Sequence, residues 1–116
     1  MIVNGVLESQ PKTLLQAPGG KKYAVINQTF TNIGSSPATF SLYLCHSGQT
    51  PPVYDSNGQV TDGDESTIVL KDYTLQPGET LLLNEEKFLL NSGDSIYANV
   101  SDSSQKVSYM LVFEEY

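Results

Sequence analysis

The sequence contains no arginine and no tryptophan, and only one cysteine and one histidine occur among its 116 residues. All six basic residues are lysines, and they stand against 13 Asp and Glu, which gives a formal net charge of −7. Nucleic-acid binding depends on clustered Lys and Arg that neutralise phosphates, and arginine forms the best forked contacts to phosphates and bases. We therefore expect no nucleic-acid partner.

The single cysteine and histidine also limit the chemistry. Cys45 has no second cysteine for an internal disulfide, so packing must stabilise the fold, and a reducing place of synthesis fits. Cys45 and His46 are adjacent in a strand-like run, and adjacent strand residues point to opposite faces, so we expect no nucleophilic pair. A typical zinc site needs more ligands than these two, and no pair of carboxylates suited to glycoside hydrolysis stands out. The sequence predicts no enzyme, no metal and no cofactor.

Long apolar runs are missing as well. No stretch of about 18 apolar residues is present, and residues 1–10 lack both a basic cluster and the apolar run of roughly 7 to 15 residues found in secretory signals. We expect no membrane partner and no secretory signal. We expect the protein to be made and assembled in a cytoplasm.

The clearest pattern present in the sequence is the alternation of apolar and polar residues. In residues 38–45 the even positions are apolar, from Ala38 to Leu44, a period of two that predicts a strand with one buried face. The same alternation predicts strands over 96–100 and 107–113, interpreted as a terminal hairpin. The run 21–32 is a longer candidate with Ala24, Ile26 and Phe30 on one face, where Gln28 suggests a bulge or a sheet rim. Shorter candidates are 13–16, 66–71 and 79–84.

These elements predict an all-β chain of seven or eight strands in a single domain over residues 1–116. No segment shows apolar residues at helical spacing with caps, and 84–90 would form at most one turn, so no substantial helix is expected. Turn residues every ~8 to 15 positions favour an antiparallel two-sheet β-sandwich, jelly-roll-like or alternatively immunoglobulin-like. The expected core comprises Phe40, Leu42, Leu44, Leu81, Leu83, Ile96, Ala98, Leu111 and Phe113. Tyr23, Tyr43 and Tyr97 fall out of phase and are expected on outer faces.

Two segments are candidates for partner contacts. Residues 1–11 form either an N-terminal arm or an edge strand, and Ile2, Val3, Val6 and Leu7 are expected to contact a neighbouring subunit or partner, with an edge strand in the same chain as the alternative. The long loop 47–66 is expected to bind something or to move. Its candidate contact residues are Pro52 and Tyr54. Its acidic residues Asp62, Asp64 and Glu65 either gather around calcium or form a solvated turn.

The order of motifs adds a resemblance. Leu75-Gln76-Pro77-Gly78-Glu79-Thr80-Leu81, the run from Leu89 to Ala98 through Gly93-Asp94, and a last strand at 107–114 resemble small virion structural proteins of tailed bacteriophages. The first half is similar, with a short strand, the Pro18-Gly19 turn and a long strand. The resemblance spans roughly residues 12–114.

That resemblance implies a non-enzymatic part of a bacteriophage particle. It would decorate the capsid or belong to the neck, tail or fibre attachment through contacts with other virion proteins. Several copies per site, in a homo-oligomer for which the resemblance favours a trimer, are also implied. The alternative is a carbohydrate-binding or adhesive β-sandwich, for which Tyr54 beside Pro51-Pro52 is the aromatic candidate in a loop.

Overall fold

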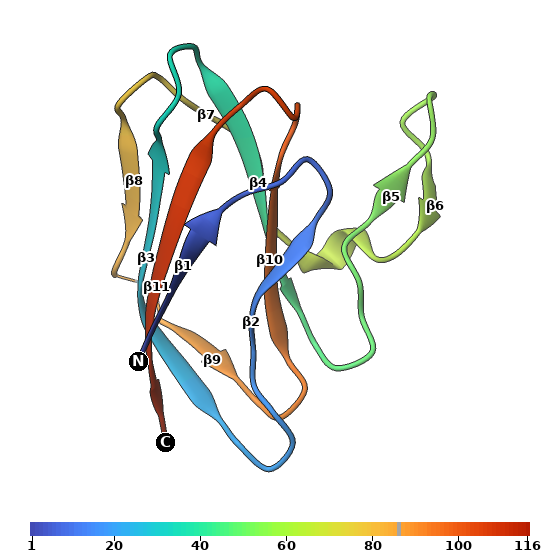
Figure 1. Cartoon of the computed structure of the whole chain (residues 1–116). Helices are drawn as coiled ribbons and strands as arrows, with labels where there is room; N and C mark the ends of the chain where they lie inside the picture. The colour runs from blue at the N-terminus through green and yellow to red at the C-terminus, as the bar shows by residue number, and fades with distance from the viewer. Residues whose placement is uncertain (86) are drawn as a thin grey trace.

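A computed structural model describes residues 1–85 and 87–116, and it contains two antiparallel sheets packed face to face (Figure 1). The five-stranded sheet has the order β1 (Ile2–Val6), β11 (Val107–Glu115), β3 (Tyr23–Asn32) and β8 (Thr80–Leu83), with β9 (Phe88–Leu90) also pairing with β3. The four-stranded sheet has the order β2 (Lys12–Gln16), β10 (Ser95–Val100), β4 (Ala38–Cys45) and β7 (Ile68–Leu75). The predicted all-β sandwich is confirmed, but the five-stranded and four-stranded sheets together hold nine strands in the described residues, more than the seven or eight expected.

The strand order is jelly-roll-like. Strands β1 to β4 alternate between the two sheets, and the chain crosses again between β7 and β8, between β9 and β10 and between β10 and β11. The predicted terminal hairpin is therefore wrong, because β10 and β11 lie in opposite sheets. Each of these strands presents an apolar row to the shared core, and a period of two does not distinguish a neighbour in the same sheet from one across the core.

The core lies between the sheets and contains the predicted residues. Phe30 of one sheet stacks on Phe40 of the other with ring centroids 4.7 Å apart, and Leu42 is 0% exposed. Phe40, Leu42, Ile96, Ala98, Leu111 and Phe113 are buried, while Leu44, Leu81 and Leu83 are partly buried and pack against them. Burial of these side chains is the main favourable term for a chain without disulfides.

The inward face of β3 differs from the expectation. The register with β11 shifts where Val112 pairs with Asn27 and Phe113 pairs with Val25, so Ile26 is an extra residue. Beyond this bulge the side chains reverse their phase. Val25 and Phe30 are buried, but so is Gln28, at 1% exposed, which places it in the core and not at a rim.

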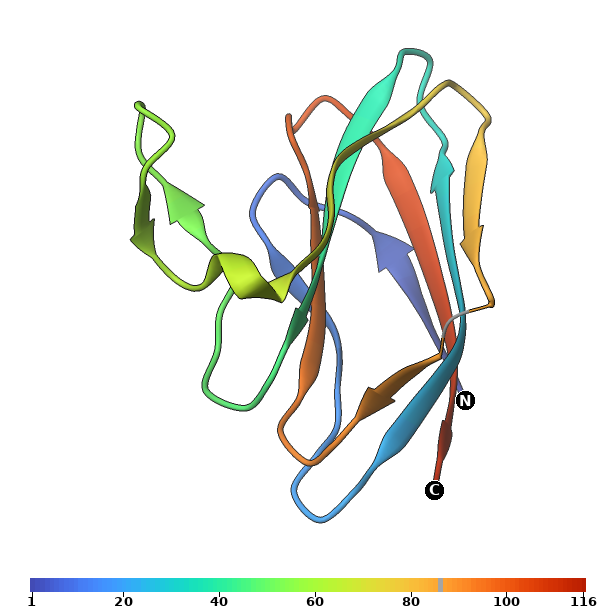
Figure 2. The same cartoon turned by 180° about the vertical axis from the view of Figure 1, so that it is seen from behind.

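The segment between β4 and β7 is partly ordered by its own short elements. β5 (Val53–Tyr54) and β6 (Val60–Asp62) form a hairpin that projects from the sandwich in both views, and η1 (Glu65–Thr67) follows as one 3₁₀ turn (Figures 1 and 2). Within residues 1–85 and 87–116, η1 is the only helical element. One turn was expected within 84–90, but the last three of these residues form the strand β9, Phe88–Leu90. No helix in the described part of the chain is long and apolar enough to cross a membrane.

Candidate functional site

The N-terminal segment is an edge strand of its own chain. β1 pairs antiparallel with β11, and Met1 and Phe113 exchange two hydrogen bonds of 2.7 and 2.9 Å. The edge-strand alternative is confirmed: β11 pairs with β3 on one side only, and its other edge pairs with β1.

Successive residues of β1 point to opposite faces of the sheet, so the four apolar residues expected at a partner contact lie on two different faces. Ile2 and Val6 point outward and are 64% and 49% exposed. Val3 packs against the core, and Leu7 is buried in it at 4% exposed. Only Ile2 and Val6 are therefore accessible to a partner; Leu7 is a core residue, which corrects its expected role.

The outer face of the five-stranded sheet forms an uncharged surface around these two residues. In the register of the sheet, Asn4 lies opposite Met110, which lies opposite Thr29, which lies opposite Leu82. Neighbouring rows are equally uncharged. We call this surface the uncharged face, and it comprises Ile2, Asn4, Val6, Asn27, Thr29, Thr31, Thr80, Leu82, Ser108, Met110 and Val112.

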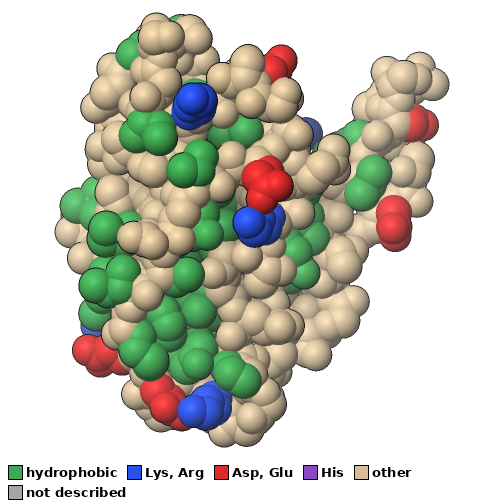
Figure 3. Space-filling model, in the orientation of Figure 1, with side chains coloured by type: hydrophobic (Ala, Val, Ile, Leu, Met, Phe, Trp, Pro, Cys, Tyr) green, Lys and Arg blue, Asp and Glu red, His purple; other side chains and the backbone are tan. Residues whose placement is uncertain are grey.

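The uncharged face is apolar at several points and slightly hollowed. Met110 is 43% exposed and Leu82 is 50% exposed. A shallow hollow of about 400 Å³ lies over the face between Asn4, Thr29 and Met110. Figure 3 shows hydrophobic side chains on the left of the molecule, where the five-stranded sheet lies, with the charged groups on that side toward its ends. An exposed sheet face of this kind is suited to contact with another protein surface.

A second candidate lies on the opposite side of the sandwich. The β5–β6 hairpin and the outer face of the four-stranded sheet enclose a cleft of about 470 Å³, which we call the hairpin cleft. Both loop residues singled out in the sequence line it, Pro52 as a buried residue and Tyr54 as a half-buried one. The Tyr54 hydroxyl donates to Glu65 at 3.0 Å, and the Lys71 ammonium lies 4.8 Å from the centre of the Tyr54 ring.

Tyr43 forms part of the floor of this cleft. Its side chain leaves the outer face of β4, as expected, yet it is only 7% exposed because the 47–66 segment and the link before β2 cover it. The Tyr43 hydroxyl donates to the Asn99 side-chain oxygen at 3.0 Å. Burial raises the pKa of Tyr43 above its usual 10.0, so the phenol keeps its proton at neutral pH.

A bulge in β7 that no sequence pattern indicates shapes the wall of the cleft. Phe40 pairs with Tyr73 and Leu42 pairs with Leu70, so both Lys71 and Asp72 lie opposite Ser41. Asp72 has a φ of 52°, the one positive φ at a non-glycine position in the described part of the chain. Its backbone N–H donates to the Ser41 hydroxyl at 3.0 Å instead of to a strand carbonyl.

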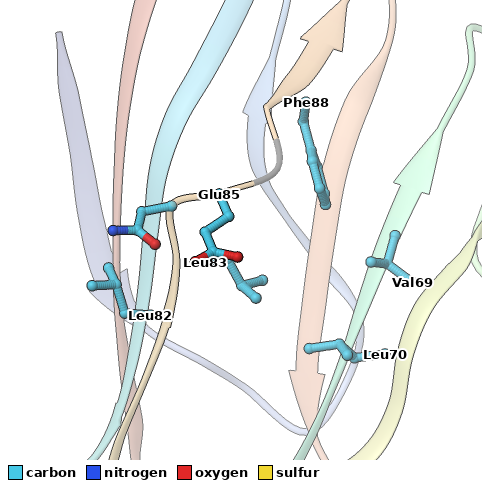
Figure 4. A pocket seen from close by; sticks show the side chains of 7 residues that line it. Val69, Leu70, Leu82, Leu83, Glu85 and Phe88 are labelled. Atoms are coloured by element: carbon cyan, nitrogen blue, oxygen red, sulfur yellow. The ribbon is translucent and has the colours of Figure 1, made fainter.

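A third hollow lies at the open edge of the sandwich, between β7 and the β8–β9 side (Figure 4). This edge slot has a volume of about 420 Å³. Leu70, Leu83 and Phe88 are directed into it, and the Glu85 carboxylate lies beside Leu83. The slot is mainly apolar and offers little to orient a ligand.

The remaining candidate chemical groups have structural partners. Hydrogen bonds from Ser66 hold the pKa of Asp64 below its usual 3.8, and Asp64 caps η1 instead of joining a calcium cluster. His46 lies 3.5 Å from the Asp94 carboxylate and is largely exposed, while Cys45 is buried. No group of three or more His, Cys, Asp or Glu that could hold a metal ion occurs among the described residues.

Comparison with known proteins gives no relationship to build on: no protein-family model matches the chain, and no curated protein matches it.

Proposed function

We propose that this protein is a non-enzymatic structural subunit of a bacteriophage particle that decorates the capsid or forms part of the neck or tail. It acts through protein–protein contacts with other virion proteins and with further copies of itself. The observation that carries this proposal is the uncharged face, centred on Met110 and bordered by the exposed edge-strand residues Ile2 and Val6. The motif order of the sequence supports the assignment to a phage particle.

Charge favours a second copy as the occupant of the uncharged face. Each chain carries a net charge of −7, and surfaces of equal sign repel when they are brought together. A contact between two copies is therefore least costly where ionisable side chains are absent. A strongly basic partner would be recognised better by an acidic surface.

The size of the face indicates weak contacts. With strands about 4.8 Å apart and about 3.4 Å per residue, four strands of five residues span roughly 19 by 17 Å, or about 320 Å². Stable interfaces bury about 800 Å² on each partner. A subunit with such a face associates weakly in dilute solution and firmly only where a particle holds many copies close together.

Analytical ultracentrifugation of the full chain, followed by mass spectrometry of purified particles, tests the proposal. The wild type should show concentration-dependent association and should occur in particles. Met110→Glu adds a charge at the centre of the uncharged face and should remain monomeric and absent from particles. Val60→Glu places the same change at an exposed valine of the β5–β6 hairpin and should behave as the wild type.

Two results would contradict the proposal. One is a wild type that stays monomeric at millimolar concentration and is missing from particles. The other is a folded Met110→Glu variant that enters particles as well as the wild type. Deleting residues 1–10 is a poorer test because it also removes Leu7 from the core.

A further inference from the structure

The hairpin cleft has no part in the function proposed above, and it lies on the other sheet from the uncharged face. Its two walls are the β5–β6 hairpin, which lies between β4 and β7 in the chain, and the outer face of β4, β7 and β10. Figure 3 shows the hairpin standing off from the body with a notch between them. A volume of about 470 Å³ lies within the ~300 to 1,000 Å³ range of small-molecule sites.

The bulge in β7 gives the cleft two charged side chains in succession. In a regular strand Lys71 and Asp72 would point to opposite faces. Because both residues lie opposite Ser41, both side chains line the cleft. Asp72 has a positive φ, which is uncommon and costs free energy, and strained residues of this kind cluster at functional sites.

Several polar groups of the cleft remain available to a ligand. Within the described residues, Lys71 and Asp72 form no salt bridge, and Gln10, Lys71 and Asp72 are all exposed. The Ser41 oxygen accepts from the Asp72 backbone N–H, which fixes the backbone beside these side chains. Donors and acceptors therefore lie close together.

The floor of the cleft is rigid. The Asn99 side chain accepts from the Tyr43 hydroxyl and donates to the carbonyls of Ser9 and Val100 at 3.1 and 3.2 Å. Tyr54 adds an aromatic surface on the hairpin side. Preorganised polar groups beside an aromatic ring limit the ordering cost of binding.

We propose that the hairpin cleft binds a neutral saccharide. A sugar hydroxyl both donates and accepts, which matches the Lys71 ammonium and the Asp72 carboxylate. The C–H face of a pyranose ring would pack on the Tyr54 ring in place of the Lys71 ammonium, which lies 4.8 Å from the ring centre in the free protein. The ligand is neutral because the cleft holds one cation and one anion side by side, so neither sign of ligand charge is favoured.

Chemical-shift titration of the ¹⁵N-labelled full chain tests this inference. The probes are the methyl glycosides of glucose, galactose, mannose and N-acetylglucosamine, and the disaccharides cellobiose, maltose and lactose. At least one probe should shift the backbone amides around Tyr43, Lys71 and Asn99 with a Kd of about 1 mM or tighter.

Two variants with matched controls assign the binding to the cleft. Asp72→Asn keeps a residue that tolerates positive φ but removes the carboxylate, and it should raise the Kd about tenfold, while Asp62→Asn on the same hairpin should not. Tyr54→Ala should raise the Kd about threefold to tenfold, while Tyr116→Ala, at an exposed tyrosine, should not. The unperturbed remainder of each spectrum reports that the variant is folded.

Three outcomes overturn the proposal. The first is that no saccharide of the panel shifts the cleft amides. The second is that the shifts persist unchanged in Asp72→Asn and Tyr54→Ala. The third is that inorganic phosphate produces the same shifts more strongly, which would make the cleft an anion site at Lys71. None of these outcomes bears on association through Met110, so the two proposals fail independently.

Discussion

Replacing Gln28 with methionine should stabilise the protein. Gln28 is 1% exposed on the inner face of β3, directly opposite Leu111 on one side and Leu83 on the other. Neither its side-chain oxygen nor its nitrogen has a hydrogen-bond partner among the described residues. An amide in this environment has lost its hydration without replacement.

The expected gain in stability follows from the cost of leaving the Gln28 amide without a partner. A buried polar group without a partner costs about 1 to 3 kcal/mol, and methionine has a similar length and is flexible enough to fill the same space. We expect Gln28→Met to raise the free energy of unfolding by about 1 to 3 kcal/mol. With a urea m-value of about 1 to 3 kcal/mol/M, the unfolding midpoint should rise by about 1 M.

Asn32 provides the matched contrast four residues along the same face. It is also fully buried, but it donates to the carbonyls of Ser36 and Leu75 at 2.9 and 3.0 Å and accepts from Gly34 at 2.9 Å. Asn32→Leu should lower the free energy of unfolding by about 3 kcal/mol, at roughly 1 kcal/mol for each lost bond.

Urea unfolding followed by circular dichroism measures both variants. The two amide replacements should change stability in opposite directions. A Gln28→Met variant less stable than the wild type by more than about 1 kcal/mol would refute the reasoning, because it would mean that the Gln28 amide contributes a favourable interaction.

Four further outcomes are expected. Leu42→Ala, at a residue 0% exposed, should cost about 2 to 5 kcal/mol in urea unfolding, and a cost below about 1 would place Leu42 at the surface. Gly63→Ala should cost at least about 1 to 2 kcal/mol and shift amide signals of residues 47–66, because φ is +75° there and a Cβ would overlap the Pro51 carbonyl; an unchanged spectrum would contradict this. The lowered pKa of Asp64 means that its cap on η1 is intact above pH 3.8 and is lost as the pH falls through the lower folded pKa, which the Ser66 amide shift should follow; a midpoint above 3.8 would be inconsistent. Cys45→Ser with His46→Ala should leave particle incorporation intact, since neither side chain lies in the uncharged face; a folded double variant missing from particles would disprove it.

The sequence predicted the strands well because burial on one face is visible as a period of two. Ala38–Cys45 was located to the residue, and the core list followed from it and from the last two strands. Which strands pair with each other was harder to predict from the sequence. The same alternation describes β10 and β11 whether they are neighbours in a sheet or face each other across the core. Turn residues between them, Asp102-Ser103-Ser104, fit either connection.

The candidate sites were predicted only in part. Tyr54 and Pro52 were identified from an unusual loop, and the structure places both at the hairpin cleft. The bulge at Lys71 and Asp72 was not predicted, because a bulge depends on the register of two strands and neither residue type indicates one. The uncharged face was not predicted, because it is built from four strands whose order was unknown. The lack of charge within 2–6, 27–31 and 108–112 was nevertheless visible in the sequence.

The place of β11 has a consequence for synthesis. β11 follows all the other described strands in the chain, yet it lies in the middle of its sheet, between β1 and β3. Until it arrives, β1 has no strand to pair with in this sheet and β3 exposes an open edge, so nascent chains carry unpaired strands that are prone to aggregate. A chain truncated before Val107 should therefore accumulate as insoluble material.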